Sequence, residues 1–298
     1  MADARISIHI AHAEWMPERK DTLARLMAQL EPQGVRPHVH RSQNREHSSV
    51  WATRMYKAAA AGRCEADVFL NDDVEVSPHL VAAVRAQLQA PTSRIVSLHT
   101  VHPVARSLAE SGLRWMRTYH VTGPAYYFRR GTAQQALDYY ADVPKAWSSK
   151  ANEDNVLISM MFRHREPIWN AMPGLVQHDT GVPSSLGYEN HPQRVCCVPW
   201  NDAALYGDLD HSTLGDPAFW KPDGEVPFLD THWTQTGTLV RQEVCNDLGI
   251  PPEWCWWCLK SAAAFGSPTS GASICPKCLH DTVGGTINAA VAAAPRRG

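Results

Sequence analysis

Two pairs of cysteines near the C-terminal end form the most specific chemical pattern in the sequence. Cys255 and Cys258 belong to "CWWC", and Cys275 and Cys278 belong to "CPKC". Residues 259–274 separate the pairs, a spacing typical of structural zinc sites. Four thiolates complete a tetrahedron around Zn²⁺ and leave no position for water, so such a site would be structural, not catalytic. Free dithiols or a redox pair are the alternative.

A second pattern is a group of polar residues at the end of an apolar run. In "VFLNDDVEV", residues 68–76, the apolar run stops at Asn71, Asp72 and Asp73 and then resumes. One interpretation is a turn, because Asn and Asp bond to their own backbone. The other is a site for a divalent cation, which binds carboxylate oxygens held on a rigid element.

Two further groups could take part in chemistry. Glu153 and Asp154 stand in the first turn of a helical pattern over 148–165, and His178 ends an apolar run within 167–181. Ordinary helix capping would explain the two acids, since negative charge suits a helix N-terminus. An ordinary core or surface histidine would explain His178. The positions of Glu153, Asp154 and His178 in the fold are needed to distinguish these ordinary roles from a role in chemistry.

The elements that would position these groups alternate along the chain. Strands are expected within 5–12, 34–41, 66–76, 94–100, 120–129 and 167–181, and helices within 17–30, 48–62, 78–90, 132–140 and 148–165. This alternation is typical of an α/β fold with a mostly parallel sheet flanked by helices. Ligands of such sheets bind beyond the carboxyl ends of the strands. One cleft is therefore expected to be lined by His12, Glu14, Trp15, Asp72 and Asp73.

Composition describes a soluble globular protein. The 298 residues are 44% hydrophobic and 19% charged, and the net charge of -2 gives no general attraction to nucleic acid or membrane. No segment approaches ~20 consecutive apolar residues, and no secretory signal is visible, so we expect no membrane span and a cytoplasmic location. In that compartment cysteines are thiols or metal ligands more often than disulfides.

The sequence divides into four parts by pattern. We expect an α/β core over 1–187 and an irregular, proline-rich segment over 188–237 that wraps the core or forms a loop facing a molecule on which the core acts. A small zinc-ribbon module is expected over 238–285, with a short helix at its start, and a flexible low-complexity tail over 286–298.

Three segments together resemble the nucleotide-sugar-dependent glycosyltransferases of the GT-A fold. They are "FLNDDVEV", "NEDNVL" and "GLVQHDTGVPSSLG", and the resemblance covers roughly residues 5–187. It implies a GT-A-like, Rossmann-type core that moves a sugar from a uridine-diphosphate sugar to a hydroxyl group. One position departs from the family pattern, because Asn71 stands where the first acidic residue of the metal motif is usual.

The resemblance also implies roles for individual residues. Asp73 and His178 would hold Mn²⁺ or Mg²⁺, with Asp72 on the metal or the ribose, and the histidine nitrogen fits Mn²⁺ better. Asp154 would be the base for the acceptor hydroxyl, with Glu153 as second choice. Further donor contacts are expected from His12, Trp15, Arg54, Lys57 and Asn71.

The expected acceptor follows from the cysteine module. A zinc ribbon on a soluble sugar transferase is reminiscent of nucleic-acid enzymes, and at the level of architecture the chain resembles phage-type DNA glycosyltransferases. This resemblance implies 5-hydroxymethylcytosine in DNA as acceptor, in the host cytoplasm for a phage-encoded chain, with the base turned out of the stack. Arg114, Trp115 and Arg117 are candidate acceptor contacts.

Two alternatives stay open. One is a cytoplasmic transferase acting on a polysaccharide, a lipid-linked sugar or a protein. The other is a non-catalytic module that uses its zinc ribbon to bind nucleic acid, an interpretation that Asn71 favours. The sequence leaves the sugar, the stereochemistry and the oligomeric state undecided.

Overall fold

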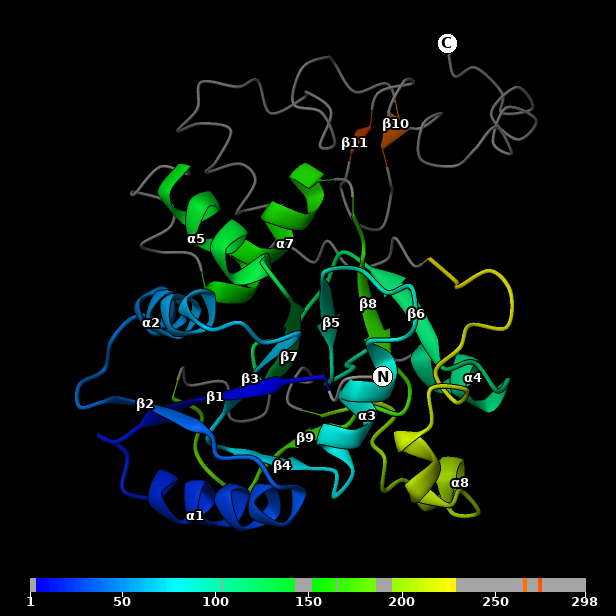
Figure 1. Ribbon diagram of the computed structural model, residues 1–298, viewed down its shortest axis with the longest axis horizontal. Coiled ribbons are helices and arrows are strands. Elements are labelled where there is room, and N and C mark those ends of the chain that lie inside the picture. The colour runs from blue at the N-terminus through cyan, green and yellow to red at the C-terminus, as the bar shows by residue number, and fades with distance from the viewer. Residues whose placement is uncertain are drawn as a thin grey trace.

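A computed structural model describes residues 4–102, 104–142, 152–164, 166–185 and 195–228, with the backbone of 265–266 and 273–274. Its centre is a seven-stranded sheet with the order β2-β1-β3-β7-β5-β8-β6 (Figure 1). The strands are β1 (Ile6–Ala13), β2 (His38–Ser42), β3 (Ala66–Asn71), β5 (Ile95–Ser97), β6 (Trp115–Thr118), β7 (Ala125–Arg129) and β8 (Ile168–Ala171).

Most strands of this sheet run in one direction. β1 pairs in parallel with β2 and β3, and β5 pairs in parallel with β8, whereas β7 and β6 are antiparallel to their neighbours. The expected mixed α/β fold with a mostly parallel sheet is confirmed. Because β7 is antiparallel, it begins at the edge where β3 and β5 end, which brings the β6–β7 connection to that edge.

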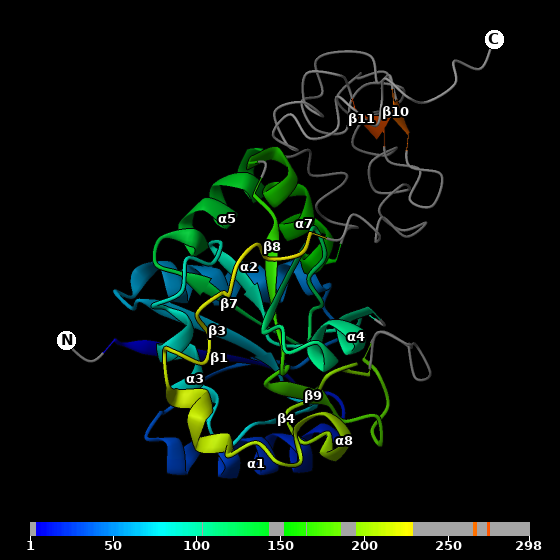
Figure 2. The same ribbon diagram turned by 90° about the vertical axis from the view of Figure 1, so that its right-hand side faces the viewer.

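Helices cover both faces of the sheet, as Figures 1 and 2 show. On one face α2 (Ser48–Ala61), α5 (Thr132–Asp142) and α7 (Glu153–His164) enclose an apolar cluster with β3 and β7. On the other, α1 (Arg19–Leu30) and α3 (Leu80–Gln87) bury their apolar residues against the sheet. The helical spacing of these apolar residues is the reason they form one buried stripe per helix. The shorter helices are α4 (Val104–Glu110) and α8 (Ala203–Tyr206), with 3₁₀ turns at Glu31–Gln33 and His211–Gly215.

A second, two-stranded sheet lies beyond the end of β3. The chain turns at Asp72 and Asp73 into β4 (Val74–Val76), which pairs antiparallel with β9 (Val176–His178). The single strands expected within 66–76 and 167–181 are therefore two strands each, β3 and β4 in the first range and β8 and β9 in the second. The register places Val74 opposite His178, so the pairing fixes His178 beside the acidic turn.

The segment 195–228 packs onto the core. Trp220 is fully buried with Trp115 of β6, whose indole Nε1 donates to the Trp220 carbonyl oxygen at 2.6 Å. The segment therefore covers the end of the sheet where β6 lies.

The predicted zinc ligands Cys255, Cys258, Cys275 and Cys278 lie outside the described residues, as do the predicted helix over 238–249 and the predicted tail over 286–298. Between the two cysteine pairs, β10 (Phe265–Gly266) and β11 (Ser273–Ile274) pair antiparallel. The zinc site stays a prediction. No helix within the described residues is long and apolar enough to cross a membrane.

Candidate functional site

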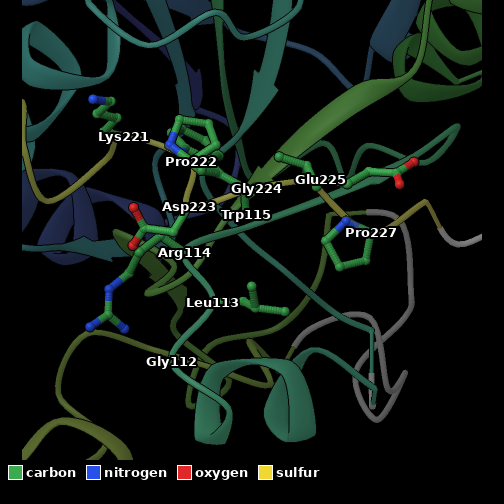
Figure 3. Close-up of a pocket in the computed structure, with 11 residues that line it drawn as sticks. Gly112, Leu113, Arg114, Trp115, Lys221, Pro222, Asp223, Gly224, Glu225 and Pro227 are labelled. Carbon is green, nitrogen blue, oxygen red and sulfur yellow. The ribbon is translucent and has the colours of Figure 1, made fainter.

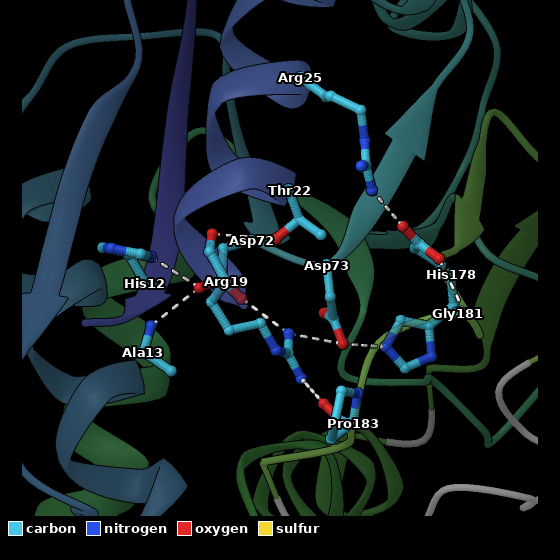
Figure 4. Close-up of polar contacts among 11 residues, drawn as sticks. His12, Ala13, Arg19, Thr22, Arg25, Asp72, Asp73, His178, Gly181 and Pro183 are labelled. Carbon is cyan, nitrogen blue, oxygen red and sulfur yellow. Dashed lines mark hydrogen bonds and ion pairs between the residues drawn. The ribbon is translucent and has the colours of Figure 1, made fainter. Parts of the chain in front are cut away.

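Asp72 has its carboxylate occupied by protein groups. Its Oδ2 accepts from His12 Nδ1 at 2.7 Å and from the Ala13 backbone N–H at 2.9 Å, and its Oδ1 accepts from Arg19 Nη1 at 2.8 Å (Figure 4). Asp72 thus bonds to the end of β1 through Oδ2 and to the start of α1 through Oδ1. Asp72 anchors the loop between these elements, and His12 is held there with it.

Asp73 shares Arg19 with Asp72 and also meets His178. Its Oδ2 lies 2.5 Å from His178 Nε2 and 2.6 Å from Arg19 Nη1, and all three side chains are buried. The backbone supports the pair, because the Asp179 N–H donates to the Asp73 carbonyl oxygen at 2.7 Å. The structure brings together Asp73 and His178, two of the three residues named as metal ligands, whereas the third, Asp72, has both carboxylate oxygens bonded to protein groups.

Arg19 is a site residue that sequence reasoning missed. Its Nη1 contacts both Asp72 and Asp73, and its Nη2 donates to the Pro183 carbonyl oxygen at 2.8 Å. The buried guanidinium offsets the charge of the two carboxylates. Within "PERKDTLARL" Arg19 stands beside Lys20 in the first turn of α1, where basic residues are usually solvated, so no signal in the pattern distinguished it.

A divalent cation fits this donor set only in part. Within the described residues, no group of three or more His, Cys, Asp or Glu side chains is placed to hold a metal ion. Asp73 and His178 offer one carboxylate oxygen and one imidazole nitrogen, and Arg19 competes for the same carboxylate. Such a pair suits a cation whose remaining ligands are diphosphate oxygens and water, because Mg²⁺ and related ions are often bound in that way.

The acidic pair Glu153 and Asp154 opens α7, as expected. Burial first, and the neighbouring Glu153 charge second, raise the pKa of Asp154 to about 7. The Oε2 atom of Glu153 is buried and has no hydrogen-bond partner among the described residues. Ser48 at the start of α2 joins the two helix ends, since its hydroxyl accepts from the Glu153 N–H at 3.4 Å. The pair therefore lies near the start of α2.

The β6–β7 connection, residues 119–124, links the acidic pair to the acidic turn. The Asn71 N–H donates to the Pro124 carbonyl oxygen at 3.0 Å, which ties the connection to the end of β3. A Cβ atom at Gly123 would lie 2.6 Å from Oε1 of Glu153, so the glycine is what lets this carboxylate approach. Gly123 and Pro124 are neighbours in the chain, and they contact Glu153 of the acidic pair and Asn71 at the acidic turn, respectively.

His99 is a second buried residue that the sequence did not single out. It follows β5, and its ring meets the His178 ring edge to face at 6.4 Å between centroids. Burial first, and the His178 charge second, lower the pKa of His99 to about 3. The imidazole is therefore neutral at physiological pH.

The other predicted donor contacts are spread more widely. Trp15 follows β1 and is half-buried, and its indole Nε1 has no hydrogen-bond partner among the described residues. Arg54 and Lys57 are exposed on α2, and Arg54 forms an ion pair with Glu46. Of these three, only Trp15 lies on the loop that Asp72 anchors.

The predicted acceptor contacts hold the 195–228 segment in place. Trp115 is 2% exposed, the Arg114 guanidinium lies 4.5 Å from the centre of the Phe219 ring, and Arg117 Nε donates to the Val226 carbonyl oxygen at 3.0 Å. A ring buried in this way offers no face to a nucleobase. The neighbouring cavity, lined by residues 112–115 and 221–227, holds about 20 Å³, room for about one water molecule (Figure 3).

Comparison with known proteins gives similarity to solved structures alone. No protein-family model and no curated protein matches the sequence. A glycosyltransferase involved in the glycosylation of the major capsid of PBCV-1 aligns at 14% identity over 64% of this chain and all of its own, with a TM-score of 0.37. A197 from STIV aligns at 12% identity over 58% of this chain and 83% of its own, with a TM-score of 0.36.

Proposed function

We propose that this chain is a metal-dependent glycosyltransferase that uses a nucleoside-diphosphate sugar, with uridine diphosphate as the expected carrier. One observation carries the proposal. A buried Asp73–His178 pair lies at the carboxyl edge of a mostly parallel sheet, and the β6–β7 connection that bonds to this edge also approaches Glu153, whose neighbour Asp154 has a pKa raised to about 7. Cation ligands and a candidate base are the two things that this reaction requires.

The residues divide the reaction between them. Asp73 and His178 would hold Mn²⁺ or Mg²⁺, which when bound offsets the charge of the leaving diphosphate. Asp154 takes the proton of the acceptor hydroxyl while the hydroxyl oxygen bonds to the anomeric carbon of the sugar. The bond from that carbon to the phosphate oxygen breaks, and its electron pair leaves with the diphosphate. Direct displacement of this kind inverts the anomeric carbon.

The raised pKa of Asp154 suits this task. A carboxylate with an ordinary pKa near 3.8 would be a weak base at neutral pH, whereas one near 7 is half ionised and more basic. Glu153 contributes through its charge, which disfavours ionisation of its neighbour. Asp154 is therefore the proposed base and Glu153 the residue that adjusts it.

We place 5-hydroxymethylcytosine in DNA first among acceptors, on the strength of the two C-x-x-C motifs. Because Trp115, Arg114 and Arg117 pack against the 195–228 segment, contacts to DNA would have to come from other residues. A glycan, lipid or protein acceptor is the competing proposal, and a non-catalytic binding module is the third.

The test is a transfer assay with a panel of uridine-diphosphate sugars and Mn²⁺, with and without duplex DNA that contains 5-hydroxymethylcytosine. A sugar-sized mass gain on the modified nucleoside, lost in Asp73→Ala and kept in the exposed control Asp208→Ala, supports transferase and acceptor together. Donor hydrolysis with unchanged DNA moves the acceptor to another class. No binding and no turnover of any donor would leave the binding module.

A further inference from the structure

His99 stands in a rigid place at the centre of the carboxyl edge. The residue before it is held from two sides, because the Leu98 N–H donates to Ala125 at 3.1 Å and the Leu98 carbonyl accepts from Leu175 at 2.9 Å. The hydroxyl of Ser97 donates to the His99 carbonyl oxygen at 2.9 Å. The side chain is 1% exposed. Its orientation is thus set by the surrounding structure.

Its hydrogen bonds define which ring nitrogen carries the proton. Thr122 Oγ1 donates to the His99 carbonyl oxygen at 3.0 Å and also lies 3.0 Å from His99 Nδ1. A hydroxyl has one proton, and a carbonyl oxygen can only accept. Both contacts are made at once only when Nδ1 carries the proton and donates it to Oγ1. The other nitrogen, Nε2, is then an unprotonated acceptor.

This acceptor has no protein partner among the described residues. Nε2 of His99 is fully buried and makes no hydrogen bond there. Buried polar atoms in native proteins are nearly always paired, so an unpaired one next to a candidate site calls for a ligand or a bound water. The ring lies against His178, which in turn contacts Asp73. The acceptor therefore belongs to the same edge of the sheet as the proposed diphosphate site.

The order of the strands in the sheet indicates which part of a bound donor would lie nearest to His99 Nε2. β1, with Trp15 just beyond its end, lies on one side of β3, and β5, with His99 just beyond its end, lies on the other side across β7. A diphosphate at Asp73 and His178 would sit between them. With the nucleoside toward Trp15, the group on the other side is the sugar. A sugar hydroxyl donates a hydrogen bond, whereas an ionised phosphate oxygen does not.

We propose that His99 Nε2 accepts a hydrogen bond from one hydroxyl of the donor sugar and thereby selects sugars that carry a hydroxyl at that position. The inference rests on the proposed function, since it names a determinant of the same site. A site built to bond a hydroxyl discriminates strongly against the analogue that lacks it, because a buried polar group is then left unpaired. Thr122 is the positioning residue that keeps Nε2 unprotonated.

Two substitutions separate the two ends of the imidazole. His99→Asn retains an amide N–H at the position of Nδ1, so the bond to Thr122 is kept while the Nε2 acceptor is lost. His99→Gln reaches further and returns an amide oxygen near the Nε2 position. Thermal unfolding of both variants is measured first, so that a folding defect is recognised.

The measurement is binding of uridine diphosphate and of a uridine-diphosphate sugar, each with Mn²⁺, by titration calorimetry. The panel includes monodeoxy forms of the best-bound sugar. In the wild type, one deoxy form is expected to bind about 10-fold more weakly than its parent, as for a lost hydrogen bond. In His99→Asn that penalty disappears, binding of uridine diphosphate alone is unchanged, and His99→Gln restores part of the penalty.

Three results would overturn the inference. A deoxy penalty that persists unchanged in His99→Asn means that a group other than Nε2 binds that hydroxyl. A loss of uridine-diphosphate binding together with Mn²⁺ binding makes His99 a cation ligand instead. Failure of the wild type to bind any nucleotide sugar would contradict the proposed function itself, and the inference with it. Because the wild type is measured first, this failure is recognised before any variant is compared.

Discussion

At the scale of single residues, Asp72 and Asp73 are neighbours in sequence with different tasks. Asp72 is bonded through both oxygens to His12, Ala13 and Arg19, whereas Asp73 faces His178. Both side chains contact Arg19 Nη1, but their other partners differ. Asp72 thus fits the interpretation of this segment as a turn, and Asp73 fits its interpretation as a cation site.

This division gives a prediction for a matched pair of substitutions. Asp72→Asn is expected to lower the free energy of unfolding by about 2–3 kcal/mol, because the Asp72 carboxylate is a buried acceptor for His12 and the Ala13 N–H as well as for Arg19. Asp73→Asn is expected to lower sugar transfer about 100-fold or more through loss of a cation ligand. Denaturant unfolding and initial rates check the two variants, and equal effects on both quantities would contradict the division.

The pH dependence of transfer is predicted from Asp154. Since the base acts in its ionised form, activity should rise with pH to a midpoint near 7 in the wild type. Glu153→Gln removes a nearby negative charge, which lowers the pKa of Asp154 and moves the midpoint to lower pH. Rates measured from pH 5 to 9 at saturating donor test this. An unmoved midpoint would assign the titration to another group.

The same carboxyl group is expected to cost stability at high pH. Its pKa rises from 3.8 to about 7 on folding, so the folded state holds the proton more tightly and loses stability as pH rises between these values. Asp154→Asn is therefore expected to be more stable than the wild type at pH 8 by about 1–2 kcal/mol, and to match it near pH 4. Denaturant unfolding at both pH values measures the difference.

At the scale of elements, the alternating pattern predicted most strands and helices from β1 to α7 in their order, but it missed α4 and β6 and joined β3 and β4 into one strand. Periodicity shows which residues are buried, but strand direction depends on pairing partners far away in the sequence, so the antiparallel β7 was not foreseen. β6 was missed because Trp115–Thr118 is short and lies among polar residues. The β4–β9 pairing was not predicted, and only the family resemblance indicated that Asp73 and His178 act together.

The β6–β7 connection carries a prediction of its own. Gly123→Ala places a Cβ 2.6 Å from Glu153 Oε1, so the carboxylate has to turn away. Because only the end of a side chain moves, stability should fall by about 1 kcal/mol or less, while transfer falls about 10-fold. In the background of Glu153→Ala the glycine substitution should have no further effect on rate. An additive loss would mean that the alanine acts on the backbone instead.

At the scale of the whole molecule, the residues proposed for the donor site lie within 4–228, whereas the cysteine motifs lie after them in the sequence. Asp73, His178, Asp154 and His99 all come from the sheet and its connections. We therefore expect that substitutions in the cysteine motifs and substitutions in the donor site impair different steps.

The last prediction follows from that separation. The purified chain should contain one zinc ion, which is lost when Cys255 and Cys258 are replaced by serine and kept when the buried thiol of Cys196 is replaced by alanine. The zinc-free variant should still bind uridine diphosphate with Mn²⁺ as the wild type does, because no ligand of that site is a cysteine. Metal analysis and calorimetry measure the two quantities. If transfer to DNA falls while donor hydrolysis continues, the module serves the acceptor; if both fall together, it supports the core that binds the donor.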